Sequence, residues 1–404
     1  MILFAKILAN LTTLSLMQDI ELQQQMVSWR HYLHQHPELS FNEQMTSDYI
    51  ASVLLEHNIE IHRGLAVTGI VATVHGKKPG KSIGLRADMD ALPIQELNEF
   101  DHKSLHDGKM HACGHDGHST MLLGAAVHLK KNNDFSGTVH FVFQPAEEGG
   151  AGGRVMVEEG IFDQFPCEAV YGMHNWPGMA EGQFAVHDSA VMAANETIEI
   201  VVKGKGGHAA MPDQCVDPIV AGAQIITALQ SVVSRNVAPS DSAVISLTVA
   251  NAGFATNVIP DEMHLKGSLR YFKPEVGAEV NRRMKKVVEG VAEAMGATAT
   301  LESRPNYPAT INTPKHAEKC ALAAGMVSGD DNVHRNMPPS MGSEDFSFLL
   351  NASEGAYIWI GNGEVPEDQP QGGCMLHNTH YDFNDNILSL GASYWVQLVT
   401  NILQ

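Results

Sequence analysis

Residues 111–118 read His-Ala-Cys-Gly-His-Asp-Gly-His, and we expect an apolar helix at 119–131 and a strand at 138–143 to follow them. A thiol, three imidazoles and a carboxylate do not suit a hydrophobic core, because each buried polar group must find a partner. They do suit a metal site with Cys113 and His115 as ligands, and Gly114 and Gly117 are expected to let the backbone turn there. A solvated loop with an incidental cysteine is the alternative for this stretch taken alone.

Three predicted strands lead directly into acidic or histidine-bearing loops. The pairs are strand 82–86 with Asp88 and Asp90, strand 138–143 with Glu147 and Glu148, and strand 169–172 with His174. The repeated order of strand, polar loop, helix and strand predicts an α/β sheet with helices on its faces. Because sites in open α/β sheets lie beyond the carboxyl ends of the strands, we expect these side chains to surround one site.

The pattern changes near residue 193. The elements expected there are strands at 196–203, 243–250, 262–272 and 298–304 and helices at 217–235 and 274–295. Their order, β-α-β-β-α-β, is that of a ferredoxin-like unit. Apolar strands and polar loops return after about residue 310, so this unit is predicted to interrupt the first domain. We therefore expect a catalytic domain formed by residues 1–192 and 309–404, with an inserted domain at 193–308.

Composition narrows the class of protein. The 404 residues are 44% hydrophobic and 18% charged, which is typical of a globular protein with more than one domain. The formal charge is −20, from 26 lysines and arginines against 46 aspartates and glutamates. Nucleic acids and anionic membranes require a basic face, so neither is expected as a partner.

The cysteines and the amino-terminal residues bear on location. Five cysteines, at 113, 167, 215, 320 and 374, are an odd number without the spacing of a disulfide framework, which favours the reducing cytoplasm. Residues 1–17 are apolar and are predicted to form a helix. A signal peptide is the alternative, although Lys6 lies inside the apolar run and no typical cleavage site follows. The run is too short and too polar to cross a bilayer.

Glu147 and Glu148 form an adjacent acidic pair at the end of an apolar strand. Neighbouring side chains of an extended backbone point in opposite directions, so one carboxylate can bind a metal while the other handles a proton. An exposed acidic pair is the common alternative. His174 and His377 offer further imidazoles, and each taken alone also fits a hydrogen-bonded loop histidine.

Six motifs together resemble the M20 metallopeptidase family, specifically its amidohydrolase branch of hippurate hydrolases, N-acyl-amino-acid deacylases and auxin-conjugate hydrolases. The motifs are Arg86–Pro93, His111–His118, Gln144–Gly149, Met173–Pro177, Gly342–Phe346 and Leu376–Asn378. The resemblance covers residues 34–385. It implies a zinc-peptidase-like α/β catalytic domain that is interrupted by a lid or dimerisation domain.

The resemblance also implies a ligand set. Cys113 would bridge two divalent metal ions, with His115 and His174 completing one site and Glu148 and His377 the other. A bridging thiolate favours Zn²⁺, with Mn²⁺, Co²⁺ or Ni²⁺ as alternatives.

Asp88 and Asp90 stand where many M20 peptidases have a His-x-Asp motif. We expect them to orient the ligands rather than bind metal. The branch commonly has proline after the motif of His377 and Asn378, whereas this chain has Thr379.

Four more residues have roles implied by the family. Glu147 would be the general base, and His208 would stabilise the tetrahedral intermediate from across a dimer interface. Asn257 and Arg270 would bind the substrate, because a guanidinium group can hold a carboxylate with two hydrogen bonds.

We therefore expect a cytoplasmic homodimer, or a tetramer built from dimers, that hydrolyses the amide bond of small N-acyl or N-aroyl amino acids. A dipeptidase or carboxypeptidase using the same site is the alternative. A metal-storing or regulatory protein without catalysis is a third hypothesis. Glu147 and His208 argue against it, since storage requires neither.

Overall fold

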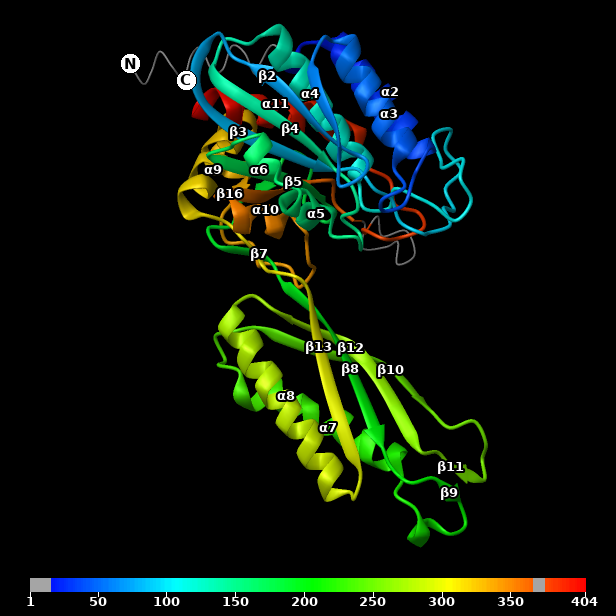
Figure 1. Ribbon diagram of the computed structural model, residues 1–404. Coiled ribbons are helices and arrows are strands. Elements are labelled where there is room, and N and C mark those ends of the chain that lie inside the picture. The colour runs from blue at the N-terminus through cyan, green and yellow to red at the C-terminus, as the bar shows by residue number, and fades with distance from the viewer. Residues whose placement is uncertain (1–15, 366–374) are drawn as a thin grey trace. The chain divides into compact units, whose positions relative to one another are not determined.

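The computed structural model describes residues 16–365 and 375–404 and divides into two compact units (Figure 1). Unit 1 comprises residues 1–191, 311–338 and 345–404, and unit 2 comprises residues 192–310 and 339–344. Residues 339–344 group with unit 2 because the carbonyls of Ser340 and Gly342 accept hydrogen bonds from the Ala193 N–H. The helix predicted for residues 1–17 falls almost wholly outside the described residues.

Unit 1 is built on an eight-stranded mixed sheet in the order β1-β2-β4-β3-β5-β16-β6-β15. Strand β3 lies between β4 and β5 and is parallel to both, and β16 is parallel to β5. The carboxyl ends of β3, β4 and β5 therefore meet at one edge, and the predicted α/β class is confirmed. The strands are β1 (Glu60–Leu65), β2 (Gly69–His75), β3 (Lys78–Asp88), β4 (Ser136–Gln144), β5 (Ala169–Trp176), β6 (Phe184–Ala185), β15 (Val333–His334) and β16 (Gly355–Gly361).

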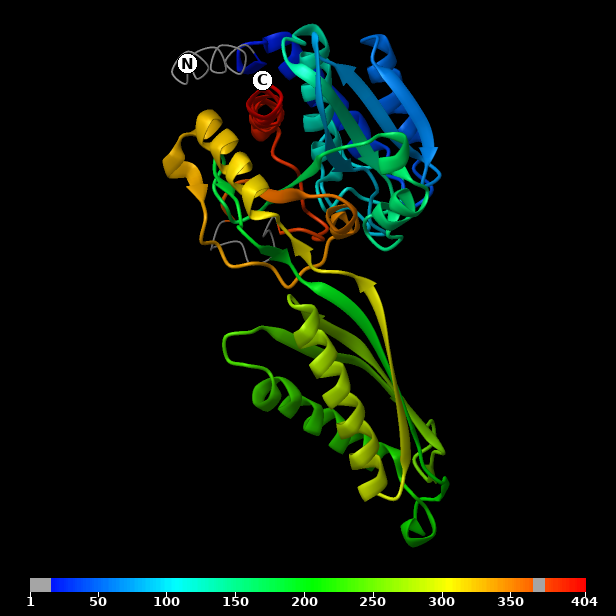
Figure 2. The same cartoon turned by 60° about the vertical axis from the view of Figure 1, so that its left-hand side comes forward.

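Helices cover both faces of this sheet (Figure 2). In one group, α2, α3 and α11 pack on α4, and α9 packs on α11. This group comprises α2 (Ile20–Gln35), α3 (Gln44–Glu56), α4 (His115–Lys131), α9 (Pro314–Ser328) and α11 (Leu388–Ile402). The other group packs on β4, β5 and β16 and comprises α5 (Gly152–Glu158), α6 (Ile161–Gln164) and α10 (Phe346–Ala352). The short elements are the 3₁₀ turns Asp330–Asn332 and Asp385–Ile387, β7 (Ala190–Met192) and β14 (Thr310–Ile311).

Helix α4 is buried along nearly its whole length and begins at His115, earlier than the predicted Ser119. Gly114, with φ 94°, turns the chain into the helix, and Asp116 lies in the first turn, where a negative charge is favourable. Gly117 does not serve as a turn, contrary to our expectation. A Cβ atom at Gly117 would lie 2.3 Å from the Phe383 ring, so the glycine is needed for close packing.

Several strands differ from the prediction, and three of them bear on the sheet of unit 1. Strand β5 continues to Trp176, because β16 pairs with it from Val170 onward. Strand β3 begins at Lys78, which pairs with Ser136, and so starts four residues before the predicted strand 82–86. Strand β1 has no predicted counterpart, because its largely exposed residues lack an alternating apolar pattern.

Unit 2 has the predicted β-α-β-β-α-β order and an antiparallel sheet in the order β10-β12-β8-β13. Strand β8 alternates buried and half-buried residues, and α8 buries an apolar stripe that includes Val280, Met284 and Val288. These faces form one hydrophobic core under the sheet. The elements are β8 (Ala194–Lys203), β9 (Gly207–His208), the 3₁₀ turn Pro212–Gln214, α7 (Pro218–Asn236), β10 (Ala243–Ala252), β11 (Val258–Ile259), β12 (Glu262–Tyr271), α8 (Pro274–Ala294) and β13 (Thr298–Tyr307).

In the described part of the chain, no helix combines the length and the apolarity needed to cross a membrane.

Candidate metal centre

Two groups of ligand atoms share Cys113 at the carboxyl edge of β3, β4 and β5. Cys113, His115 and His174 form the first group, and their ligand atoms all lie within 4.8 Å of one another. Cys113 precedes α4, His115 opens it, and His174 lies in β5. The Cys113 Sγ and His174 Nε2 atoms are 3.4 Å apart. All three residues are buried.

Cys113, Glu148 and His377 form the second group, within the same 4.8 Å limit. The Glu148 Oε1 atom lies 3.5 Å from His377 Nε2 and 3.9 Å from His115 Nε2. His377 has a positive φ of 65°, and its N–H donates to the Ala112 carbonyl at 2.7 Å. The backbone beside Cys113 therefore holds His377 directly.

Both imidazoles of the first group, those of His115 and His174, are fixed through Nδ1, which leaves Nε2 directed at the cluster. His115 Nδ1 donates to the Asp90 carbonyl at 2.9 Å, and His174 Nδ1 donates to the Asn175 carbonyl at 2.6 Å. His115 Nε2 and Glu148 Oε1 are buried without a hydrogen-bond partner among the described residues. Imidazoles held in this way, with the other nitrogen free, are typical of metal ligands.

The electrostatics of the cluster are those of an anionic site. Burial, together with the charges of Glu148 and Glu147, raises the pKa of the Cys113 thiol well above its ordinary value. Burial lowers the pKa of His115, but Asp88 and Asp90 outweigh it and raise that pKa to about 10. A cation here would offset the negative charge and favour the thiolate. The donor set therefore fits a divalent metal ion.

Asp88 and Asp90 lie behind the ligands, at the end of β3. Asp88 accepts hydrogen bonds from His118 Nδ1 at 2.6 Å and from Arg86 Nη1 at 2.7 Å. The two carboxylate oxygens of Asp90 accept the backbone N–H groups of Glu147 and Glu148, each at 3.0 Å. Both aspartates are fully enclosed. Asp90 thus orients the acidic loop, and Asp88 orients the first turn of α4.

The other polar residues of the opening motif have different partners. His118 Nε2 accepts the Asn175 N–H at 3.0 Å, so both of its ring nitrogens are occupied. Asp116 accepts a hydrogen bond from His34 at 2.8 Å. His111 is buried, and neither ring nitrogen has a hydrogen-bond partner among the described residues. Of this motif, only Cys113 and His115 enter the two groups built around Cys113.

Glu147 lies beside the ligands at the end of β4 and is 7% exposed. It can form a further cluster with His115 and Glu148, whose atoms also lie within 4.8 Å. The backbone N–H of Asp345 donates to Glu147 Oε1 at 3.4 Å. A carboxylate near the ligands that belongs to neither group containing Cys113 is suited to proton transfer.

The remaining predicted site residues belong to unit 2, where His208 lies in the two-stranded β9–β11 sheet and Arg270 in the four-stranded sheet. His208 pairs with Val258 in β11, and the Asn257 carbonyl accepts the Ala209 N–H at 3.1 Å. Arg270, at the other end of β12, donates to the Met341 carbonyl at 2.8 Å. Glu262, which starts β12 after a two-residue connection from β11, is eight residues from Arg270, or about 26 Å along the strand. Within one chain, His208 and Asn257 are neighbours, but Arg270 is remote from both.

Several supporting residues were not predicted. Arg86 donates to Asp88, Gln144 and Asp345, which ties the ends of β3 and β4 to the start of α10. Glu43, just before α3, accepts the Ala146 N–H at 2.9 Å. Arg86 and Asp345 belong to motifs that the sequence singled out. Glu43 has no local signal, because its partner is 103 residues away.

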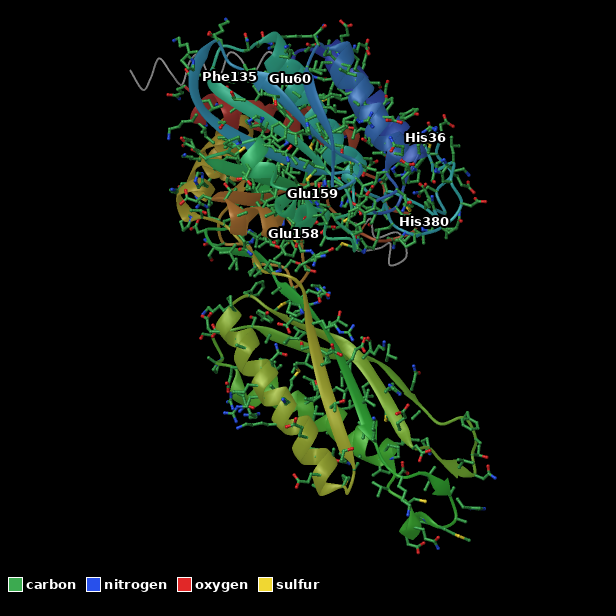
Figure 3. All side chains as sticks on the ribbon, in the orientation of Figure 1. His36, Glu60, Phe135, Glu158, Glu159 and His380 are labelled. Atoms are coloured by element: carbon green, nitrogen blue, oxygen red, sulfur yellow. The ribbon has the colours of Figure 1, made fainter. Side chains whose placement is uncertain are left out.

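Histidine is abundant, and most of the 21 histidines lie elsewhere. His36 and His380, marked in Figure 3, belong to neither group of ligands. His36 Nδ1 donates to the Tyr32 carbonyl one helical turn earlier, at 2.8 Å. The spatial grouping, rather than the number of histidines, identifies the candidate ligands.

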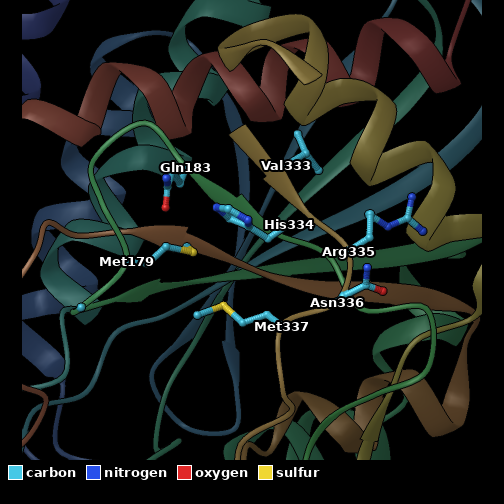
Figure 4. A pocket seen from close by; sticks show the side chains of 8 residues that line it. Met179, Gln183, Val333, His334, Arg335, Asn336 and Met337 are labelled. Carbon is cyan, nitrogen blue, oxygen red and sulfur yellow. The ribbon is translucent and has the colours of Figure 1, made fainter. Parts of the chain in front are cut away.

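One cavity of unit 1 has none of these ligands in its lining. It has a volume of about 600 Å³, and Met179, His334 and Met337 are among the side chains that line it (Figure 4). A smaller one of about 290 Å³ lies at Asp382–Asp385. Neither lining includes a predicted site residue.

Comparison with known proteins gives a consistent picture. The model of peptidase family M20/M25/M40 matches residues 84–401. The chain is 38% identical to a hippurate hydrolase of Campylobacter jejuni, over 95% of this chain and 98% of that protein. It is 37% identical to an N-acetylcysteine deacetylase of Bacillus subtilis, over 96% and 99%. A crystal structure from Bacillus subtilis, described as a dinuclear metal-binding peptidase of the M20 family, matches with a TM-score of 0.83 and 34% identity, over 95% and 99%.

Proposed function

Because this chain belongs to peptidase family M20/M25/M40, we propose that it is a metal-dependent amidohydrolase of N-acyl and N-aroyl amino acids. The products would be a carboxylic acid and a free amino acid. The observation that carries the proposal is the pair of ligand groups that share Cys113, with Glu147 beside them. Residues 1–192 and 309–404 are proposed as the catalytic domain, and residues 193–308 as the lid and dimerisation domain.

We propose that the centre holds two divalent ions, with Cys113 as the bridging ligand. His115 and His174 would complete one site, and Glu148 and His377 the other. The thiolate and imidazole donors favour Zn²⁺, with Mn²⁺, Co²⁺ or Ni²⁺ as alternatives. When bound, such ions polarise a carbonyl group and lower the pKa of water.

Glu147 is proposed as the general base. Its carboxylate takes a proton from the attacking water and returns it to the nitrogen of the leaving amine. Two features support this role: it lies among the ligand atoms, and the Asp345 N–H holds one of its oxygens at 3.4 Å. The adjacent Glu148 would bind metal, so one carboxylate would act as a ligand and the other as a base.

His208 is proposed as the donor that stabilises the oxyanion of the tetrahedral intermediate. Its Nδ1 atom accepts the Ala210 N–H at 3.1 Å, so a neutral ring carries its proton on Nε2. Nε2 is therefore the atom that can donate. His208 is exposed in the single chain. Its side chain is therefore available to contact a second subunit.

A homodimer is proposed because the family resemblance implies that His208 acts across a dimer interface. Within one chain, His208 lies in the β9–β11 ribbon beyond the start of β12, while Arg270 lies near the other end of β12. Arg270 would bind the substrate carboxylate, and His208, with Asn257 beside it, would act in the site of the other subunit. Strand β10 supports a dimer interface: it lies at the sheet edge, and nearby Val249 and Phe254 are 37% and 96% exposed. A tetramer built from such dimers is the larger alternative.

A cytoplasmic location is also proposed. Cys113, Cys167, Cys215 and Cys320 are free thiols among the described residues, which suits a reducing compartment. The partners would be small substrates rather than nucleic acid or membrane, since the chain carries a net charge of −20.

A substrate panel tests the proposed function. The Zn²⁺-loaded enzyme is assayed on hippurate, N-acetyl amino acids, N-acetyl-diaminopimelate and unmodified dipeptides, and kcat/KM is compared. We expect the acylated amino acids to be preferred. A preference for the dipeptides would identify the dipeptidase or carboxypeptidase alternative, and tight metal binding without any hydrolysis would indicate the storage function instead.

A further inference from the structure

The acidic loop that carries Glu147 and Glu148 leaves β4 through an unfavourable backbone conformation. Ala146 has φ 57°, in the left-handed region that residues with a Cβ atom avoid for steric reasons. Ala146 is also fully buried, so solvent cannot compensate the turn. Such a conformation persists only where neighbouring groups hold it in place.

Two buried carboxylates hold three successive amides of this loop. Glu43 Oε1 accepts the Ala146 N–H at 2.9 Å. Asp90 then accepts the N–H groups of Glu147 and Glu148, each at 3.0 Å. Only the first of these three bonds acts on the left-handed residue itself. The Ala146 carbonyl also accepts the N–H groups of Gly150 and Gly152, at 3.2 and 3.1 Å, so Glu43 supplies the side-chain contact that helps to fix the direction of the turn.

Glu43 is itself held rigidly. Its Oε1 also accepts the Phe41 N–H at 3.0 Å, and its Oε2 accepts the Thr68 hydroxyl at 2.8 Å. The side chain is fully buried, and burial together with the charge of Asp90 raises its pKa to about 7. A second buried carboxyl group beside Asp90 is electrostatically unfavourable. Its presence therefore indicates a role other than stabilising the fold.

Helix capping does not supply that role. Glu43 stands at the position before α3, but its side chain makes no capping hydrogen bond to the helix. Asp19 and Asp217, at the same position before α2 and α7, do accept helix N–H groups. The Glu43 side chain is directed at the acidic loop instead.

We propose that Glu43 is a positioning residue for the reaction, which sets the Ala146 turn so that Glu148 faces the metal site and Glu147 faces the substrate. The inference rests on the proposed function. Glu43 acts only through the backbone and touches neither ligand nor substrate. Its replacement should therefore change the geometry of the centre while leaving every ligand in the chain.

Three variants separate positioning from general stability. Glu43→Leu removes the acceptor for Ala146, whereas Glu43→Gln keeps an oxygen there and loses only the charge. Thr68→Val is the matched control, because it removes one bond to Glu43 and leaves the Ala146 contact intact. Each full-length protein is loaded with Co²⁺, and its visible spectrum, its melting temperature and its kcat and KM on hippurate are measured.

We expect Glu43→Leu to lower kcat by about 10–100-fold with little change in KM, as loss of groups that orient metal ligands usually does. The Co²⁺ spectrum of Glu43→Leu should also shift. Glu43→Gln should have nearly the kcat and the Co²⁺ spectrum of the parent, and so should Thr68→Val. Equal losses of kcat in Glu43→Leu and Thr68→Val at equal loss of melting temperature would overturn the inference. So would an unaltered spectrum and kcat in Glu43→Leu.

If Glu43→Leu does not fold, Glu43→Asp answers the same question, because it keeps the charge and withdraws the acceptor from Ala146. An unchanged kcat and spectrum in Glu43→Asp would then overturn the inference. The Co²⁺ spectrum needs no substrate, so it still tests Glu43 if the parent enzyme fails on the substrate panel. Failure of the proposed function is thereby distinguished from failure of the positioning role.

Discussion

The Sγ atom of Cys113 lies 3.4 Å from Nε2 of His174, although 61 residues separate them in the chain. One belongs to the segment before α4 and the other to β5, and burial shifts the pKa of each toward its uncharged form. Neither shift suits an isolated catalytic thiol, which requires a low pKa. The pair is instead arranged for a cation that both residues bind.

Replacement of Cys113 tests the bridge. Cys113→Ala should lose at least one of two bound ions per chain, because it removes the atom that the two ligand groups share. Metal analysis after dialysis measures this, with Cys215→Ala, a free thiol of unit 2, as the control. Two ions retained at the parent affinity would contradict a bridging thiolate.

Replacement of Glu147 separates chemistry from metal binding. Glu147→Gln should keep the metal content of the parent while kcat falls by about 10²–10⁴-fold, the usual worth of a general base. Metal analysis and steady-state kinetics on hippurate provide the two readings. Turnover equal to that of the parent would rule out the base assignment, and loss of metal would mark Glu147 as a ligand.

Mixed dimers test whether His208 acts in the other subunit. His208→Ala and Glu147→Gln should each be inactive alone. A dimer with one of each contains one site with both groups intact, so random mixing should recover up to about a quarter of the parent activity. Differently tagged subunits allow the mixed dimer to be isolated. If the isolated mixed dimer remains inactive, His208 does not act across the interface.

The buried pair of His34 and Asp116 predicts a pH-dependent stability. Burial lowers the pKa of His34, but hydrogen bonds with Asp116 and Glu96 raise it from 6.5 to about 9. A raised histidine pKa stabilises the fold below pH 6.5, and that contribution is lost as the pH rises through about 9. The difference in unfolding free energy between the parent and His34→Asn should therefore shrink by about 3 kcal/mol from pH 6 to pH 10. Urea denaturation across this range measures it, and a constant difference would refute the expectation.

Gly117 provides a packing test. Gly117→Ala would bring a Cβ atom 2.3 Å from the Phe383 ring and should destabilise the protein by about 1–3 kcal/mol. Gly290→Ala in α8 meets nothing within 4 Å and should stabilise it by up to about 1 kcal/mol. Thermal unfolding compares the two. Similar changes in stability for both variants would show that the Phe383 ring can move aside at little cost.

The strand ends explain how far the sequence could predict the candidate site. Asp88, Glu147 and His174 each follow or end an apolar strand, and β3, β4 and β5 are parallel neighbours, so local patterns were enough to place them together. The order of elements in unit 2 was predicted for the same reason, since each element has a clear apolar period.

Contacts between distant segments could not be predicted. Nothing in the local sequence marks Glu43, and only the fold directs its side chain to Ala146. The pairing of β9 with β11, which places His208 beside Asn257, joins segments about 50 residues apart, and local patterns do not determine it. Helix α4 begins early because Gly114 adopts a left-handed conformation, which depends on the neighbours of its backbone.

The packing of Phe383 against Gly117 also joins distant parts of the sequence. Cys113, Glu148 and His174 precede unit 2 in the chain, whereas His377 follows it, and the segment that carries His377 reaches α4 through Phe383. The group of ligand atoms from Cys113, Glu148 and His377 is therefore complete only while this late segment is docked on α4, whereas the group from Cys113, His115 and His174 does not depend on it.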